Sequence, residues 1–120
     1  MLPRLYRLKK ESDFDRLFKK GMVKSGEFLT IRFIDNGRGT SRFGFVVGSK
    51  SFKKASLRNK LKRKLREAVK GNLALIEPGK DVAFAAKTGA IDKSVKETGE
   101  HIFSLLNQAG LIKKQQTPQQ

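Results

Sequence analysis

The stretch that most constrains the fold is the run SLRNKLKRKLREAV at residues 56–69. At about 100° per residue on a helix, its apolar side chains fall in one sector and its basic side chains in the next. An apolar stripe of this kind must pack against another element, and the strand-like segments on both sides of the run predict a sheet. The helix is expected over residues 53–76, with Ser56 at its start and Gly71 as a candidate break. The stripe consists of Leu57, Leu61, Leu65, Ala68 and Val69.

Two segments before this helix alternate with a period of two and are rich in β-branched and aromatic residues, which predicts strands at residues 28–34 and 42–48. The sequence DNGRGTS between them, residues 35–41, has the glycines that a tight turn needs. We expect the two strands to pair as an antiparallel hairpin, with residues 22–25 as a short extra strand.

The remaining segments complete an α+β pattern. A first helix is expected at residues 12–20, with Ser12 as its cap and Gly21 at its end, and an apolar strand at 81–88 with both faces covered. Ser94 is placed to cap a third helix that runs to Ala109, with its core side at Ile102, Phe103, Leu105 and Leu106. The predicted fold is a single-domain sandwich of a small mixed sheet with packed helices, in the order α-β-β-β-α-β-α. The domain is expected to span residues 1–112, followed by a disordered polar tail at 113–120.

The charge balance indicates a polyanionic partner. The chain has 27 basic and 11 acidic residues, a net charge of +16, and residues 50–70 alone have ten basic residues and one acid. A solvated helix face is the simpler explanation, but such faces usually mix signs, because like charges four residues apart destabilise a helix. Nucleic acid is the first candidate partner. An anionic membrane surface is the weaker candidate, because the helix has no aromatic anchor on its apolar side.

Several other classes of function are disfavoured. The chain has no Cys, which excludes disulfides, Cys-based zinc sites and a thiol nucleophile. No apolar run approaches the roughly 20 residues of a membrane span, and the basic N-terminus lacks the apolar region of a signal peptide, so a cytoplasmic location is expected. The single His, His101, lies within a predicted helix and is expected to be structural, and the acids are scattered. No catalytic residue and no metal ligand are therefore expected in this chain.

The run RNKLKRKLRE, residues 58–67, resembles the Arg-Asn-Arg signature of the bacterial ribonuclease P protein component. Other segments match that family in the same order: a basic arm ending in LKK, a helix DFDRLFKKG, a strand FGFVVGSK and a late strand DVAFAAKTGA. The resemblance covers nearly all of residues 4–112. It implies a sandwich like one domain of a small-subunit ribosomal protein, with a left-handed βαβ crossover, whereas general topology rules favour a right-handed one.

The resemblance also implies a function. Ribonuclease P is a ribonucleoprotein endonuclease that removes the 5′ leader of precursor tRNA, and its RNA subunit performs the hydrolysis with bound magnesium. The protein subunit binds this RNA and the single-stranded leader, which strengthens substrate binding. On composition alone, a ribosomal or other general RNA-binding protein remains the alternative.

The signature implies which side chains face RNA. Arg can bind phosphate through two parallel hydrogen bonds, whereas Lys acts as a point charge. Lys60 departs from the usual signature, where Arg is more typical. Arg58 lies beside the apolar stripe, where its charge must either extend out to solvent or meet a defined partner. The RNA-binding candidates are Lys50, Lys53, Lys54, Arg58, Asn59, Lys60, Lys62, Arg63, Arg66 and Lys70.

A second site follows from the resemblance, which places the leader in a cleft between the sheet and the first helix. The matching candidates are Phe14, Phe18 and Ile31, although two Phe residues four apart are also typical of a core. In the strand at 42–48, the face with Gly44 and Gly48 is nearly flat and could admit a nucleic-acid backbone closely.

Overall fold

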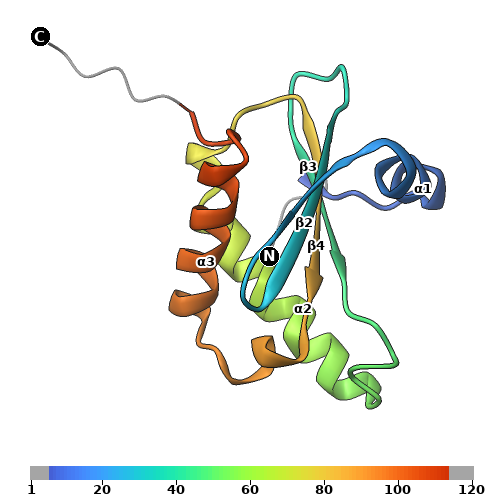
Figure 1. The fold of residues 1–120 in the computed structure, drawn as a ribbon, viewed down its shortest axis with the longest axis vertical. Coiled ribbons are helices and arrows are strands. Elements are labelled where there is room, and N and C mark those ends of the chain that lie inside the picture. The colour runs from blue at the N-terminus through green and yellow to red at the C-terminus, as the bar shows by residue number, and fades with distance from the viewer. Residues whose placement is uncertain (1–5, 114–120) are drawn as a thin grey trace, which may run out of the picture.

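The computed structural model describes residues 6–113 and has three layers, a helix, a sheet and a pair of helices (Figure 1). Helix α1 (Glu11–Lys20) lies on one face of the sheet, and α2 (Ala55–Lys70) and α3 (Val95–Gln108) cover the other. The α+β class and the order of helices and strands are confirmed. The strands between these layers are β1 (Met22–Ser25), β2 (Leu29–Asp35), β3 (Arg42–Val46) and β4 (Lys80–Ala86).

The four strands form one mixed sheet in the order β1-β2-β4-β3. β1 and β2 are an antiparallel hairpin, and β4 pairs antiparallel with β2 and parallel with β3. The predicted hairpin between residues 28–34 and 42–48 is therefore wrong, because β4 is inserted between these two strands. β4 buries Asp81, Val82, Ala83 and Phe84 in sequence, so both of its faces are covered and a central position suits it.

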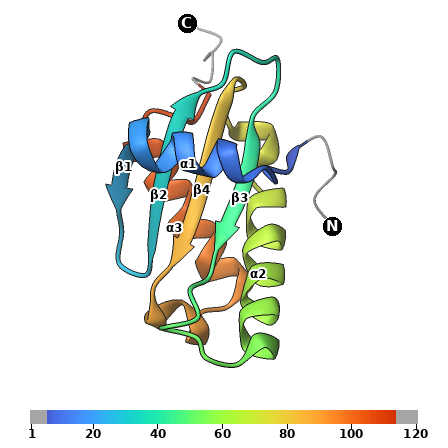
Figure 2. The same cartoon turned by 90° about the vertical axis from the view of Figure 1, so that its right-hand side faces the viewer.

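The connection from β3 through α2 to β4 is left-handed. Seen from the α1 side, β3 and β4 both point downward, β4 lies to the left of β3, and α2 runs behind the sheet (Figure 2). A right-handed crossover would place β4 on the other side of β3. The handedness implied by the resemblance is confirmed.

Two helix ends differ from the sequence predictions, and the start of α3 agrees with them. α1 begins after Lys10, and no side chain caps it, so the prediction of Ser12 as the cap is wrong. α2 ends at Lys70, and after a turn at Gly71 a short 3-10 turn, η2 (Leu73–Leu75), replaces the predicted helix to residue 76. α3 has the predicted start: Ser94 accepts a hydrogen bond from the Glu97 amide, and Glu97 accepts one from the Ser94 amide, a complete capping box.

The main core lies between the sheet and the pair α2–α3, and the predicted stripe of α2 packs into it. Phe103 is 37% exposed, so its predicted place in the core is wrong, although Ile102, Leu105 and Leu106 are buried as expected. A smaller core of Leu8, Leu17 and Ala83 lies under α1. Of the predicted tail, residues 114–120 lie outside the described residues, and the amide of Lys113 donates to the Leu75 carbonyl.

Candidate nucleic-acid interface

The polar side of α2 forms a ridge of like charge. Its amphipathic pattern buries Leu61, Leu65, Ala68 and Val69 and leaves the basic side chains outward. In the described residues, the three salt bridges all lie on other elements, so no acid there forms a salt bridge with this ridge. We call it the basic ridge of α2: Asn59, Lys60, Lys62, Arg63, Arg66 and Lys70.

Arg58 has a different place from the rest of the signature. Its Nη1 donates to the carbonyl oxygens of Phe52 (2.8 Å) and Lys53 (3.0 Å), in the segment that leads into α2. These carbonyls are the partner that a cation beside an apolar stripe requires. Arg58 thereby holds the exposed candidates Lys53 and Lys54 against the start of the helix.

Lys64 is also bound within the protein. Its Nζ donates to the carbonyl oxygens of Ala90 (2.7 Å), Ile91 (3.1 Å) and Lys93 (2.7 Å) in and after the 3-10 turn η3 (Thr88–Asp92). Burial lowers the pKa of Lys64, the charge of Asp92 partly offsets this effect, and the neighbouring Lys60 lowers the pKa further. Sequence reasoning treated Lys64 only as one more charge on the helix, since no sequence signal indicates carbonyls 26–29 residues away.

A groove of about 370 Å³ lies where α1 crosses β3 and approaches α2. The half-buried ring of Phe14 lies against Gly44, and a Cβ at position 44 would come within 2.4 Å of its Cζ atom. The face of β3 that was predicted to be flat is therefore covered by Phe14 at Gly44, whereas Gly48 is open. We call this the α1 groove, and its lining includes Leu8, Phe14, Gly44, Phe45, Lys62 and Arg66.

Two further leader-cleft candidates have different outcomes. Phe18 is 43% exposed on α1, and the Arg32 guanidinium lies over its ring at 5.0 Å from the centroid. Ile31 has 0% exposure and belongs to the core on the opposite face of the sheet, so its assignment to the cleft is wrong. Successive residues of a strand point to opposite faces, and it is Arg32, one residue further along, that faces α1.

A buried ionic network fixes α1 on the sheet. Asp81 is 1% exposed and accepts two hydrogen bonds from Arg42 (2.9 and 2.8 Å) and one from Asn36 (2.9 Å). Arg42 also pairs with Asp13 in the first turn of α1, at 3.4 Å. The hydrogen bond with Asp81 raises the pKa of Arg42 above its ordinary value. The network therefore sets the position of Phe14, the residue next to Asp13, above β3.

His101 has the structural place that its sequence context indicated. Its Nε2 accepts a hydrogen bond from the Phe28 amide at 3.3 Å, and its ring stacks on Phe28 with the centroids 4.1 Å apart. Burial lowers the pKa of His101, so the neutral ring that can accept this bond is favoured. Over residues 6–113, no three His, Cys, Asp or Glu side chains come together as metal ligands.

None of the helices in the described part of the chain is both long and apolar enough to span a bilayer.

The predicted cations Lys50, Lys53 and Lys54 are exposed just before α2. With the basic ridge they make one continuous stretch of positive surface along a single helix and the segment leading into it.

Comparison with known proteins identifies the family. The family model for ribonuclease P matches residues 2–110. Relatives named ribonuclease P protein component include one from Alkaliphilus oremlandii, 35% identical with 88% of this chain and 92% of the relative covered. Another, from Clostridioides difficile, is 33% identical with 87% and 91% covered.

Solved structures agree with the sequence relatives. The RNase P protein of Staphylococcus aureus superposes with a TM-score of 0.79 at 30% identity, over 90% of this chain and 98% of the other. The RNase P protein of Thermotoga maritima superposes with a TM-score of 0.77 at 32% identity, over 85% and 96%. The family model, the sequence relatives and the superposed structures agree, so the chain belongs to the ribonuclease P protein family and serves tRNA 5′ processing as the protein component of that ribonucleoprotein.

Proposed function

We propose that the chain binds the ribonuclease P RNA through the basic ridge of α2 and holds the single-stranded 5′ leader of precursor tRNA in the α1 groove. The observation that carries this proposal is that Lys62 and Arg66 belong to both sites: they lie on the ridge and line the groove beside Phe14. One helix can then bind the RNA subunit and the leader at the same time. The general RNA-binding alternative is not favoured, because the family match covers residues 2–110.

The groove has the chemistry that a single strand needs. Surfaces that bind single-stranded nucleic acid combine cations for the phosphates with aromatic rings for the bases. Phe14 and Phe45 supply rings, and the Arg66 guanidinium lies 6.0 Å from the centroid of the Phe45 ring. Phe18, with Arg32 over its ring, extends the same combination towards the other end of α1.

The protein's own residues do not fit a magnesium site near this surface. Magnesium prefers oxygen ligands, usually one or two carboxylates, but Glu67 is the only acid among ten cations in residues 50–70, and Asp13 and Asp81 are bound to Arg42. We propose that the RNA subunit holds the magnesium and hydrolyses the phosphodiester bond, and that this chain contributes no catalytic residue. The proposed place of the reaction is the cytoplasm.

Reconstitution tests the proposal. The protein is mixed with a bacterial ribonuclease P RNA at low magnesium, and removal of the leader from precursor tRNA is measured. We expect the protein to stimulate cleavage strongly, and an absence of stimulation would contradict the proposal.

The leader assignment needs a variant of its own. Phe14→Leu keeps an apolar side chain in the groove but removes the ring, so binding of leader-bearing tRNA should weaken by about fivefold or more, since a base stacked on a ring contributes roughly 1–3 kcal/mol. Mature tRNA, which has no leader, serves as the control and should bind as tightly as to the wild type. Equal weakening of binding for both RNAs would contradict the assignment of the leader to the α1 groove.

A further inference from the structure

The flank of α2 away from the α1 groove borders a second groove, along the seam with η3 and α3. Two adjoining hollows form it, one of about 270 Å³ between Leu57, Leu61 and Ile91, and one of about 520 Å³ beside Lys60, Arg63 and Val95. Ile91 is 38% exposed and Val95 is 47% exposed, so the groove offers apolar surface to an incoming group. We call it the α2–α3 groove.

Lys64 gives this groove a fixed wall. Its ammonium donates to the carbonyls of Ala90, Ile91 and Lys93, which ties η3 to α2 and holds Ile91 at the rim. Because its donors are bound to these carbonyls, Lys64 is part of the wall, whereas Lys60 and Arg63 remain exposed at the edge. The groove is thus an apolar surface with two outward cations beside it.

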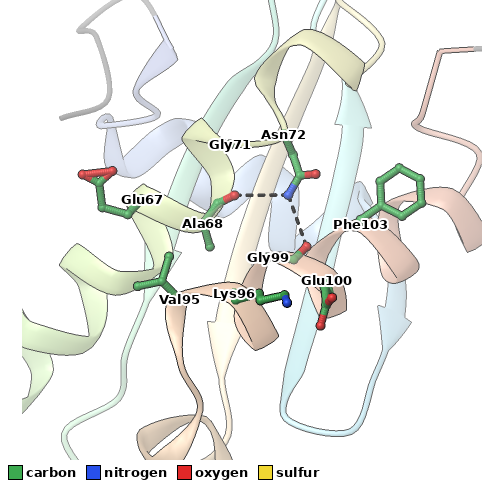
Figure 3. Close-up of a pocket in the computed structure, with 9 residues that line it drawn as sticks. All are labelled: Glu67, Ala68, Gly71, Asn72, Val95, Lys96, Gly99, Glu100 and Phe103. Atoms are coloured by element: carbon green, nitrogen blue, oxygen red, sulfur yellow. Dashed lines mark hydrogen bonds between the residues drawn. The ribbon is translucent and has the colours of Figure 1, made fainter.

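The charge changes sign along the seam. Further towards the C-terminus of α2, the next hollow is lined by two acids, Glu67 and Glu100, by one cation, Lys96, and by Phe103 (Figure 3). Val95 lines all three hollows. Glu67 lies at the border, because it also lines the hollow beside Lys60 and Arg63. Cations outnumber this one acid in that hollow, whereas acids outnumber cations in the next one, so an anion is attracted to the half of the seam near Lys60 and Arg63.

We propose that the basic half of the α2–α3 groove holds one unpaired nucleotide of the ribonuclease P RNA, with its phosphate at Lys60 and Arg63 and its base against Ile91 and Val95. The partner is RNA because the two cations belong to the basic ridge of α2, the surface proposed to bind that RNA. The nucleotide is unpaired because only a base that has left its stack presents a flat apolar face to such a surface. The identity of the RNA rests on the proposed function.

This assignment gives the two flanks of α2 separate tasks. Of the two grooves, Lys62 lines only the α1 groove and Lys60 and Arg63 line only the α2–α3 groove, whereas Arg66 lines both. The leader and the RNA subunit can therefore contact the same helix from its two flanks, with Arg66 lying between the two grooves.

Affinity measured against salt concentration separates base contacts from phosphate contacts. Ile91→Ser and Val95→Ser should each weaken binding to the ribonuclease P RNA by about fivefold, the lower end for a stacked base, with an unchanged salt slope. Lys60→Gln should weaken binding and reduce the slope of log K against log salt by about 0.7–0.9, because one phosphate contact is lost. Phe103→Ser, at a similarly exposed apolar residue in the acidic half, is the matched control and should bind as the wild type does.

Chemical probing of the RNA 2′-hydroxyls locates the nucleotide. Wild-type protein should protect at least one unpaired nucleotide that becomes reactive again with Val95→Ser, provided that the variant melts at the wild-type temperature. Wild-type affinity in both serine variants, or protection confined to duplex, overturns this inference while leaving the proposed function in place. Failure of the wild-type protein to bind the RNA overturns both.

Discussion

Arg58 shows that one residue of an RNA-binding signature can have a structural task. Its guanidinium donates to two carbonyls of the segment before α2, so Arg58→Ala should lower the free energy of unfolding by about 1–3 kcal/mol. Arg58→Lys keeps the charge but loses the planar guanidinium, so we expect its free energy of unfolding to lie between those of Arg58→Ala and the wild type. Denaturant unfolding in the absence of RNA measures this.

Arg63 provides the matched comparison on the same helix. It is exposed, so Arg63→Ala should leave the free energy of unfolding within about 0.5 kcal/mol of wild type while weakening RNA binding and reducing its salt slope. Equal stability of Arg58→Ala and Arg63→Ala would show that the carbonyl contacts contribute nothing.

His101 should make stability depend on pH. Burial lowers its pKa in the folded protein below the value of about 6.5 in the unfolded chain. The stability that the neutral His101 ring contributes is therefore fully present above pH 6.5. It is lost as the pH falls through the folded pKa, because the unfolded chain takes up the proton first. Glu27, Lys87 and Lys93 are the charged groups that act on the ring.

His101→Gln isolates this effect, since the amide oxygen can accept the Phe28 hydrogen bond but does not titrate. Thermal unfolding between pH 8 and pH 5 should show a smaller decrease for the variant than for the wild type. Parallel decreases in the two proteins would assign the pH dependence to other groups.

At the scale of elements, the docking of α1 depends on the absence of a side chain at Gly44. A Cβ on residue 44 would lie 2.4 Å from the Phe14 ring, so Gly44→Ala should destabilise the fold by about 1–3 kcal/mol and displace the ring from the α1 groove. In a Phe14→Leu background the same change should cost less, because the smaller side chain can move away. A double-mutant cycle on unfolding free energies measures this coupling, and strict additivity would contradict it.

The elements themselves were largely predictable, but their pairing was not. Local signals decide a helix end such as Ser94–Glu97 or a stripe such as Leu57 to Val69, and these predictions agree with the structure. Pairing of β3 with β4 depends on residues about 40 apart, so the turn at 35–41 could not reveal that β4 separates β2 from β3. The same limit hid the carbonyl partners of Lys64. The assignment of Ile31 to the cleft failed for a different reason: it was taken from the resemblance, and a difference of one residue along a strand changes the face of the sheet.

At the scale of the whole molecule, charge that serves binding opposes folding. The net charge of +16 is concentrated on and before α2, whose N-terminus has Lys54 at its cap and no acid in the first turn. Positive charge at this end is unfavourable with the helix dipole, and Lys60 and Lys64 repel each other four residues apart. The sequence alone was enough to predict this conflict, because it depends on spacing within one helix.

The double variant Lys54→Gln/Lys60→Gln tests whether the conflict is real. At low salt its free energy of unfolding should exceed that of wild type by about 0.5–1.5 kcal/mol, since one change relieves the helix dipole and the other relieves Lys64. The gain should shrink in 1 M salt, where the screening length falls to about 3 Å. Affinity for the ribonuclease P RNA should fall in the same variant, with a smaller salt slope. A double variant that is no more stable than the wild type at low salt would show that the native fold accommodates these charges without cost. The loss of RNA affinity would then be the only argument that the charges are present for RNA binding.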